Sequence, residues 1–137
     1  MIIVQDAVRV GVPAASAYAH LVRFDEYPRF MSGVLGCTPV DDAAAHLTLD
    51  VGGCRVELDA VIADTDPDAY VHWDAATLSE SFWLQETAGH TDVTAVLRLD
   101  QHSVRLYDDL PEDVLRRRLR MDLKGFRRLC EESGDAR

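Results

Sequence analysis

The sequence predicts an α+β fold in which a seven-stranded curved antiparallel sheet wraps around a long C-terminal helix, with two short helices after the first strand. Three observations predict it. An apolar strand runs into a proline-started helix, a series of alternating segments separated by turn residues fills the middle of the chain, and one amphipathic segment closes it. The strands need a cover for their apolar face, and only the closing segment is long enough to supply it.

The N-terminal segment predicts a strand over residues 2–12, because alternate side chains there are mostly aliphatic. Pro13 then suits the first position of a helix, where its missing N–H is no loss. That helix is short and carries one apolar stripe. Asp25 is placed to cap a second short helix that ends near Met31.

The middle of the chain is typical of consecutive antiparallel strands. Gly52-Gly53 indicates a tight hairpin between two strands, and residues 64–68 indicate a turn between two others. Alternation assigns one face of each strand to the interior, and that face is almost wholly aliphatic. The residues expected on it are Val56, Leu58, Ala60, Ile62, Val93, Ala95 and Leu97.

The C-terminal segment is the clearest predicted helix. Pro111 starts it, acidic residues fill its first turn and basic residues follow, which is the polarity that the helix dipole favours. Gly125, in mid-helix, leaves room for a ligand or for a neighbouring backbone segment. Apolar residues recur at spacings of three and four and share one face: Leu115, Leu119, Leu123, Phe126 and Cys130.

Composition limits the partners. The length suits a single domain over residues 1–137, and the formal net charge of −10 argues against nucleic acid or an anionic membrane as the main partner. No segment approaches the ~18 apolar residues of a membrane span, and the N-terminus lacks the basic region of a signal peptide, so an integral membrane protein is not expected. Three widely spaced cysteines favour reduced thiols in a cytoplasmic protein.

Other chemistries find little support in the sequence. The histidines show no metal-ligand spacing, and no nucleophile elbow, phosphate-binding glycine loop or dinucleotide fingerprint occurs, so neither a metal nor a cofactor is expected. A basic cluster lies at Arg116, Arg117, Arg118 and Arg120. It predicts a solvated helix face or, as the alternative, a surface for anionic ligands or an acidic carrier protein.

Several motifs, taken in order, resemble the START-like helix-grip (SRPBCC) superfamily. They are Val12-Pro13, residues 25–31, Pro67 followed by Val71-His72-Trp73, residues 89–93, and Asp122-Leu123 with Phe126. The branch they resemble most is the bacterial polyketide cyclase/dehydrase and coenzyme Q-binding group. This resemblance covers nearly the whole chain and implies a cavity between sheet and helix for a lipid, sterol, quinone or polyketide. Partners compatible with it are a hydrophobic small molecule, an acyl carrier protein and a second copy of the chain.

Asp122 and Arg118 are the candidate catalytic residues. Asp122 falls on the edge of the apolar stripe, so its carboxyl group is expected at the cavity wall, where desolvation raises its pKa and suits it to general acid or base catalysis. The alternative is an ion pair with Arg118, four residues earlier, at the rim of the helix.

Candidate ligand-binding residues come from the segment after the first helix, from the inward face of the sheet and from the apolar stripe. They are Tyr27, Phe30, Met31, Val56, Leu58, Trp73, Phe82, Leu119, Leu123 and Phe126. Trp73 and Phe82 either stack on an aromatic ligand or fill the core. The three residues after the first helix either form a lid over the pocket or anchor a short helix.

Two functions remain open at this point. One is a polyketide cyclase or dehydrase that acts on a bound acyl chain, and the other is a non-catalytic carrier of a quinone or lipid. Chemistry in an apolar pocket needs a few convergent polar groups. The aliphatic inward faces therefore favour binding of a hydrophobic small molecule and leave catalysis undecided.

Overall fold

A computed structural model of the chain describes residues 1–51, 53–100 and 112–135. Over these residues, seven strands form one antiparallel sheet in the order β1-β7-β6-β5-β4-β3-β2. Each strand from β2 onward pairs with the next one along the chain, and β1 pairs with the last, β7. The strands are β1 (Ile2–Val10), β2 (Val34–Asp41), β3 (Ala44–Val51), β4 (Cys54–Asp66), β5 (Tyr70–Ala75), β6 (Leu78–Thr87) and β7 (His90–Leu99).

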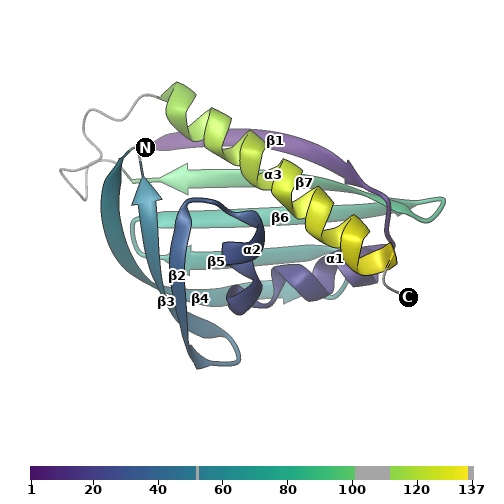
Figure 1. The fold of residues 1–137 in the computed structure, drawn as a ribbon, viewed down its shortest axis with the longest axis horizontal. Helices are drawn as coiled ribbons and strands as arrows, with labels where there is room; N and C mark the ends of the chain where they lie inside the picture. Colours follow the sequence, from purple (N-terminus) through teal and green to yellow (C-terminus); the bar gives the residue numbers. More distant parts are fainter. Residues whose placement is uncertain (52, 101–111, 136–137) are drawn as a thin grey trace.

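Helices cover one face of this sheet (Figure 1). They are α1 (Ala14–Leu21), the 3-10 helix η1 (Phe24–Glu26), α2 (Tyr27–Phe30) and the long α3 (Glu112–Asp135). Helix α3 crosses the sheet diagonally (Figure 1). Two contacts join it to β1 and to the residue after that strand. Arg120 Nε lies 3.4 Å from Asp6 Oδ2, and the Gly11 amide donates a hydrogen bond to Glu131 Oε2 at 2.8 Å. The predicted fold, a curved sheet around a long C-terminal helix, is confirmed.

Two local predictions differ from the structure. Residues 64–66 extend β4 instead of forming a turn, because they pair with residues 70–72 of β5. The turn is therefore confined to the residues between the two strands, where Asp68 takes a positive φ of 63°. Asp25 caps neither η1 nor α2, since its carboxylate accepts a hydrogen bond from Arg23 at 2.9 Å.

The β3–β4 hairpin turns at Gly53, which adopts a φ of 87°. A residue with a side chain is strained in that left-handed region, so a glycine suits this turn. Gly52, the other glycine predicted there, and Pro111, the predicted start of α3, lie outside the described residues. No helix in the described part of the chain is both long and apolar enough to cross a membrane.

The interior follows the two periodicities of the sequence. Strand alternation points one face of the sheet inward, and the apolar stripe of α3 lies against that face. The inward residues of the central and final strands are buried or pack partly buried against the core, and they include Val56, Leu58, Ala60, Ile62, Trp73, Phe82, Val93, Ala95 and Leu97. From α3 the buried apolar residues are Leu115, Leu119, Leu123, Phe126, Leu129 and Cys130.

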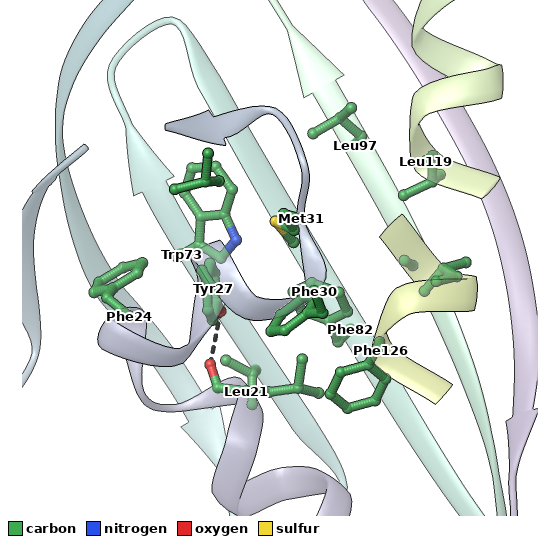
Figure 2. Packing of buried hydrophobic residues seen from close by; sticks show 14 of the residues in the cluster. Leu21, Phe24, Tyr27, Phe30, Met31, Trp73, Phe82, Leu97, Leu119 and Phe126 are labelled. Atoms are coloured by element: carbon green, nitrogen blue, oxygen red, sulfur yellow. Dashed lines mark hydrogen bonds between the residues drawn. The ribbon is translucent and has the colours of Figure 1, made fainter. Parts of the chain in front are cut away.

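A row of aromatic rings links the sheet to α3 (Figure 2). Trp73 of β5 packs edge-on against Tyr27, whose ring centroid lies 5.2 Å from that of Phe30. Phe30 in turn packs edge-on against Phe126 of α3 at 5.1 Å. The Tyr27 hydroxyl donates to the carbonyl oxygen of Leu21 at 2.7 Å, which fixes the row to the end of α1.

Gly125 allows α2 to pack closely against α3. A Cβ atom at this position would clash with the carbonyl oxygen of Phe30 and lie 3.2 Å from its carbonyl carbon. The glycine in the middle of α3 therefore makes room for a neighbouring backbone segment, which is one of the two roles expected for it. This close approach also holds the aromatic row in place.

Candidate functional site

A small cavity lies between the sheet, α3 and the segment that carries α2. Its volume is about 30 Å³, which is enough for about two water molecules and far less than a drug-sized ligand needs. Most of the wall is apolar, and the polar groups are confined to a few side chains. The lining residues are Tyr27, Met31, Val34, Leu47, Leu49, Trp73, Leu78, Glu80, Leu97, Leu115, Arg118 and Asp122.

Glu80 brings a carboxyl group to this cavity from the middle of the sheet. On β6 it faces Trp73 of β5 on one side and Leu97 of β7 on the other. It is only 3% exposed. Burial raises the pKa of Glu80 well above its usual range, and the nearby Asp122 carboxylate raises it further, whereas Trp73 and Arg118 oppose the shift. Burial therefore favours the protonated form of Glu80.

Asp122 brings a second carboxyl group, from α3. It is 6% exposed, and its Oδ1 atom is buried without a hydrogen-bond partner. Burial raises the pKa of Asp122 to about 7, against the opposing charge of Arg118. Near neutral pH, Asp122 can therefore both take up and release a proton, whereas burial favours the protonated form of Glu80.

Arg118 lies at the edge of the cavity, one turn before Asp122 on α3. Its guanidinium group occupies the space that a Cβ atom of Gly33 would take, so the glycine makes room for it in the connection between α2 and β2. Within the described residues no ion pair joins Arg118 to Asp122, and the influence of Arg118 on the two carboxyl groups acts through space. The predicted pair at the helix rim is therefore absent.

Trp73 and Tyr27 complete the polar part of the wall. The indole Nε1 of Trp73 is buried and makes no hydrogen bond of good geometry, although it lies close enough to Glu80 to favour the ionised carboxylate. Burial holds the pKa of Tyr27 well above its usual range, so its hydroxyl stays neutral and donates to Leu21. The unpartnered atoms of Trp73 and Asp122 are a donor and an acceptor that a ligand can meet.

The structure brings together both candidate catalytic residues and part of the candidate ligand-binding set. Asp122, Arg118, Tyr27, Met31 and Trp73 line the cavity. The other candidates belong to the packed core around it: Phe30, Val56, Leu58, Phe82, Leu119, Leu123 and Phe126. The segment after α1 is anchored by the aromatic row, because its Tyr27, Phe30 and Met31 side chains are at most 5% exposed.

Glu80 is the site residue that sequence reasoning missed. The signal is present in the sequence, because Phe82 is expected on the inward face of its strand and Glu80 lies two residues before it, on the same face. A charged residue on an inward face is costly to bury, and that cost marks the position as one with a role.

The pair of carboxyl groups defines what the site can do. Two buried carboxyl groups in a largely apolar wall, beside a guanidinium group, are of the kinds that can act as an acid, a base and a stabiliser of negative charge. In the described part of the chain, no cluster of three or more His, Cys, Asp or Glu side chains could hold a metal ion.

A curved sheet that holds a long helix over an apolar cavity defines the START-like, helix-grip class of proteins. Within that class, the chain belongs to the family described as polyketide cyclase / dehydrase and lipid transport, whose sequence model matches residues 10–127. The resemblance predicted from the motifs is thereby confirmed. Both activities in the family description concern largely apolar molecules, so the family supports binding of a hydrophobic small molecule.

Known proteins are similar to the chain in sequence or in fold. An uncharacterized 17.2 kDa protein of Streptomyces lincolnensis is 29% identical over 138 residues, covering 96% of this chain and 91% of that protein. The Zhui aromatase/cyclase of a Streptomyces species superposes with a TM-score of 0.76 at 16% identity, over 93% of this chain and 92% of that one. A START superfamily protein of Mycobacterium smegmatis gives 0.68 at 14% identity, over 97% of both chains. At identities of 16% and 14%, the likeness to these two structures shows a shared fold and nothing further.

Proposed function

We propose that the protein binds a hydrophobic small molecule between the sheet and α3 and catalyses proton transfers on it, as a polyketide cyclase or dehydratase does. The observation that carries the proposal is the convergence of Glu80, Asp122 and Arg118 on one largely apolar cavity. Convergent polar groups with perturbed pKa values in an apolar pocket are typical of active sites. An aliphatic inward face alone favours a carrier. Glu80 favours an enzyme, because it adds a second carboxyl group beside Asp122 in the cavity wall.

On a poly-β-ketone chain, the ionised Asp122 carboxylate removes a proton from a methylene group between two carbonyls. The enolate carbon then forms a bond to the carbon of another carbonyl group, whose oxygen takes the proton of Glu80 and becomes a hydroxyl. Arg118 stabilises the charge on the enolate oxygen. In a following dehydration, protonated Asp122 gives its proton to the leaving hydroxyl, water departs, and the Glu80 carboxylate removes the neighbouring C–H proton. Both groups are then restored.

A ligand of this size requires the cavity to open, because the present volume of about 30 Å³ is too small for it. The proposal includes an acyl carrier protein as the partner that delivers the chain.

The second candidate function is a non-catalytic carrier of a lipid or quinone. It is favoured by the apolar part of the cavity wall, which strands of the sheet and α3 supply. Leu47, Leu97 and Leu115 are representative of that wall. A carrier needs no proton transfer, and in that case the two carboxyl groups serve only to orient the cargo.

The test compares turnover and binding of a poly-β-ketone substrate in three variants of the full chain. Glu80→Gln and Asp122→Asn keep the shape of each side chain and remove its proton chemistry. We expect each to reduce turnover about 100-fold or more while substrate affinity changes little. Glu57→Gln is the matched control, because its carboxylate is 67% exposed and pairs with His46 away from the cavity.

The same samples decide between the two functions. Native mass spectrometry of freshly purified protein detects any lipid or quinone that co-purifies. Wild-type protein that binds the substrate and leaves it unconverted, and that carries such a lipid, is a carrier. Turnover that survives in both Glu80→Gln and Asp122→Asn removes these residues from the mechanism.

A further inference from the structure

An open groove adjoins the cavity and shares Arg118 with it. Its volume is about 550 Å³. The α2–β2 connection, the β3–β4 hairpin and the N-terminal half of α3 form its walls, which are Ser32, Gly33, Asp50, Gly53, Val114, Arg117, Arg118 and Met121. Because Arg118 lines both spaces, the groove and the cavity meet at its side chain.

The arginines of α3 differ in how they are paired. Three of them have a carboxylate partner: Arg116 with Glu112 at 2.9 Å, Arg120 with Asp6 at 3.4 Å, and Arg127 with Glu131 at 3.2 Å.

Arg117 and Arg118, in contrast, make no ion pair or hydrogen bond with any residue that the structure describes. Arg128 shares this property, but it lines neither the groove nor the cavity. Arg117 and Arg118 both line the groove, so two guanidinium groups without a partner among the described residues lie together there.

The acidic residue of the groove is already engaged. Asp50 accepts a hydrogen bond from the Gly53 amide at 2.9 Å, and its own amide donates to the Gly33 carbonyl at 2.7 Å. These bonds hold the β3–β4 hairpin and the α2–β2 connection beside each other. The carboxylate of Asp50 is thereby used to shape the wall, and the basic charge of the groove comes from Arg117 and Arg118.

The position of Arg118 depends on Gly33. Its guanidinium group lies against the α carbon of this glycine, in space that any side chain would occupy. The backbone of the α2–β2 connection thus holds the group at the junction of groove and cavity. The planar guanidinium fork matches carboxylate and phosphate groups and binds them in two-point contacts.

We propose that Arg117 and Arg118 bind the anionic end of an amphipathic ligand, a carboxylate or a phosphate monoester, while the apolar part of the ligand reaches into the cavity. This inference rests on the proposed function, since it names the class of molecule that the cavity receives. The anion lies in the open groove, where it stays partly hydrated, and the apolar chain passes Arg118 towards Glu80 and Asp122.

The experiment measures binding of three ten-carbon probes to the full-length chain by calorimetry, each below its aggregation concentration. Decanoate carries a carboxylate, decyl phosphate carries a phosphate, and 1-decanol is neutral. We expect wild-type protein to bind at least one anion about tenfold or more tightly than decanol, because a hydrogen bond to a charged group has this magnitude. The anion that wild-type protein binds more tightly shows whether the natural ligand ends in a carboxylate or in a phosphate.

Two sets of variants test the residues. The double variant R117Q/R118Q is expected to lose the preference, leaving anion and alcohol within about twofold. Gly33→Ala keeps the charge, displaces the Arg118 guanidinium and is expected to reduce the preference in part. The matched control R116Q/R120Q removes the same charge from paired positions of the same helix and should keep the preference.

The outcomes separate this inference from the proposed function. Equal affinity of wild-type protein for all three probes, or equal loss in R116Q/R120Q and R117Q/R118Q, overturns the arginine site and leaves binding of hydrophobic molecules intact. Failure of all three probes to bind wild-type protein overturns both. Thermal unfolding of each variant verifies that the fold is kept.

Discussion

Glu80 of β6 and Asp122 of α3 bring two buried carboxyl groups to the wall of one cavity, although 42 positions separate them in the sequence. Each is expensive to ionise there, and ionisation of Asp122 makes ionisation of Glu80 harder still. The two groups therefore lose their protons in sequence rather than together. Such a pair costs stability at high pH, and that cost is measurable.

The first prediction concerns the pH dependence of stability. Burial raises the pKa of Asp122 to about 7 in the folded protein, whereas an unfolded aspartate titrates at about 4. Between these values the folded state holds a proton that the unfolded state has released. The free energy of unfolding therefore falls as the pH rises through this window, by about 1 kcal/mol per pH unit.

Asp122→Asn is expected to remove this contribution, so that the variant gains stability relative to wild type as the pH rises from about 4 to about 7. Urea unfolding followed by tryptophan fluorescence at several pH values measures the effect. Asp92→Asn is the control: Arg9 lowers the pKa of the exposed Asp92, whose contribution changes only below this window. Parallel pH profiles for wild type and Asp122→Asn would show that Asp122 does not titrate there.

Much of the fold could be predicted because its signals are local. Strand alternation and the apolar stripe of α3 are properties of short segments, and they identified the inward residues of the sheet and helix correctly. Glu80 could have been found by the same alternation. Its position on the inward face follows from its spacing of two residues from Phe82.

The contact between Gly33 and Arg118 could not be predicted in this way. It joins residues 85 positions apart, and it depends on how the α2–β2 connection meets α3 in three dimensions. The volume of the cavity could not be predicted from the sequence either, because the cavity is the small space left after large side chains fill the interior. Predicting it requires the rotamers of every lining residue.

The second prediction concerns Gly125. Alanine has the higher helix propensity, by about 1 kcal/mol, yet its Cβ would clash with the backbone of Phe30. Backbone cannot move as a flexible side chain can, so we expect Gly125→Ala to lower the free energy of unfolding by a net value of about 1–2 kcal/mol. Denaturant unfolding measures it. Lys124→Ala, at an exposed neighbouring position, should stay within about 0.5 kcal/mol, and a stabilised Gly125→Ala would contradict the close packing of α2 on α3.

The third prediction concerns the hydroxyl of Tyr27. It is buried and donates to the Leu21 carbonyl at 2.7 Å, so Tyr27→Phe leaves that carbonyl without its partner. We expect a loss of about 1–2 kcal/mol in the free energy of unfolding. Tyr70→Phe is the comparison, because its hydroxyl lies 3.4 Å from Ser81 Oγ in a partly exposed position, and a smaller loss is expected. Equal losses in the two variants would mean that the buried hydrogen bond of Tyr27 stabilises the fold no more than the partly exposed one of Tyr70.

The fourth prediction separates cavity size from stability. Leu97 lines the cavity, whereas Leu99, two residues further along β7, is buried in the core and does not. Truncating either leucine to alanine should lower the free energy of unfolding by about 2–5 kcal/mol. Only Leu97→Ala enlarges the space of about 30 Å³ between the sheet and α3.

Because a ligand has to open that space in the wild-type protein, the larger cavity of Leu97→Ala lowers the cost of entry. We expect tighter binding of 1-decanol to Leu97→Ala and unchanged or weaker binding to Leu99→Ala, measured by calorimetry at a temperature where both variants remain folded. If the two variants bind decanol alike, the change in affinity follows from loosened packing in general. A gain confined to Leu97→Ala locates the apolar part of the ligand beside Glu80, its register partner on β6.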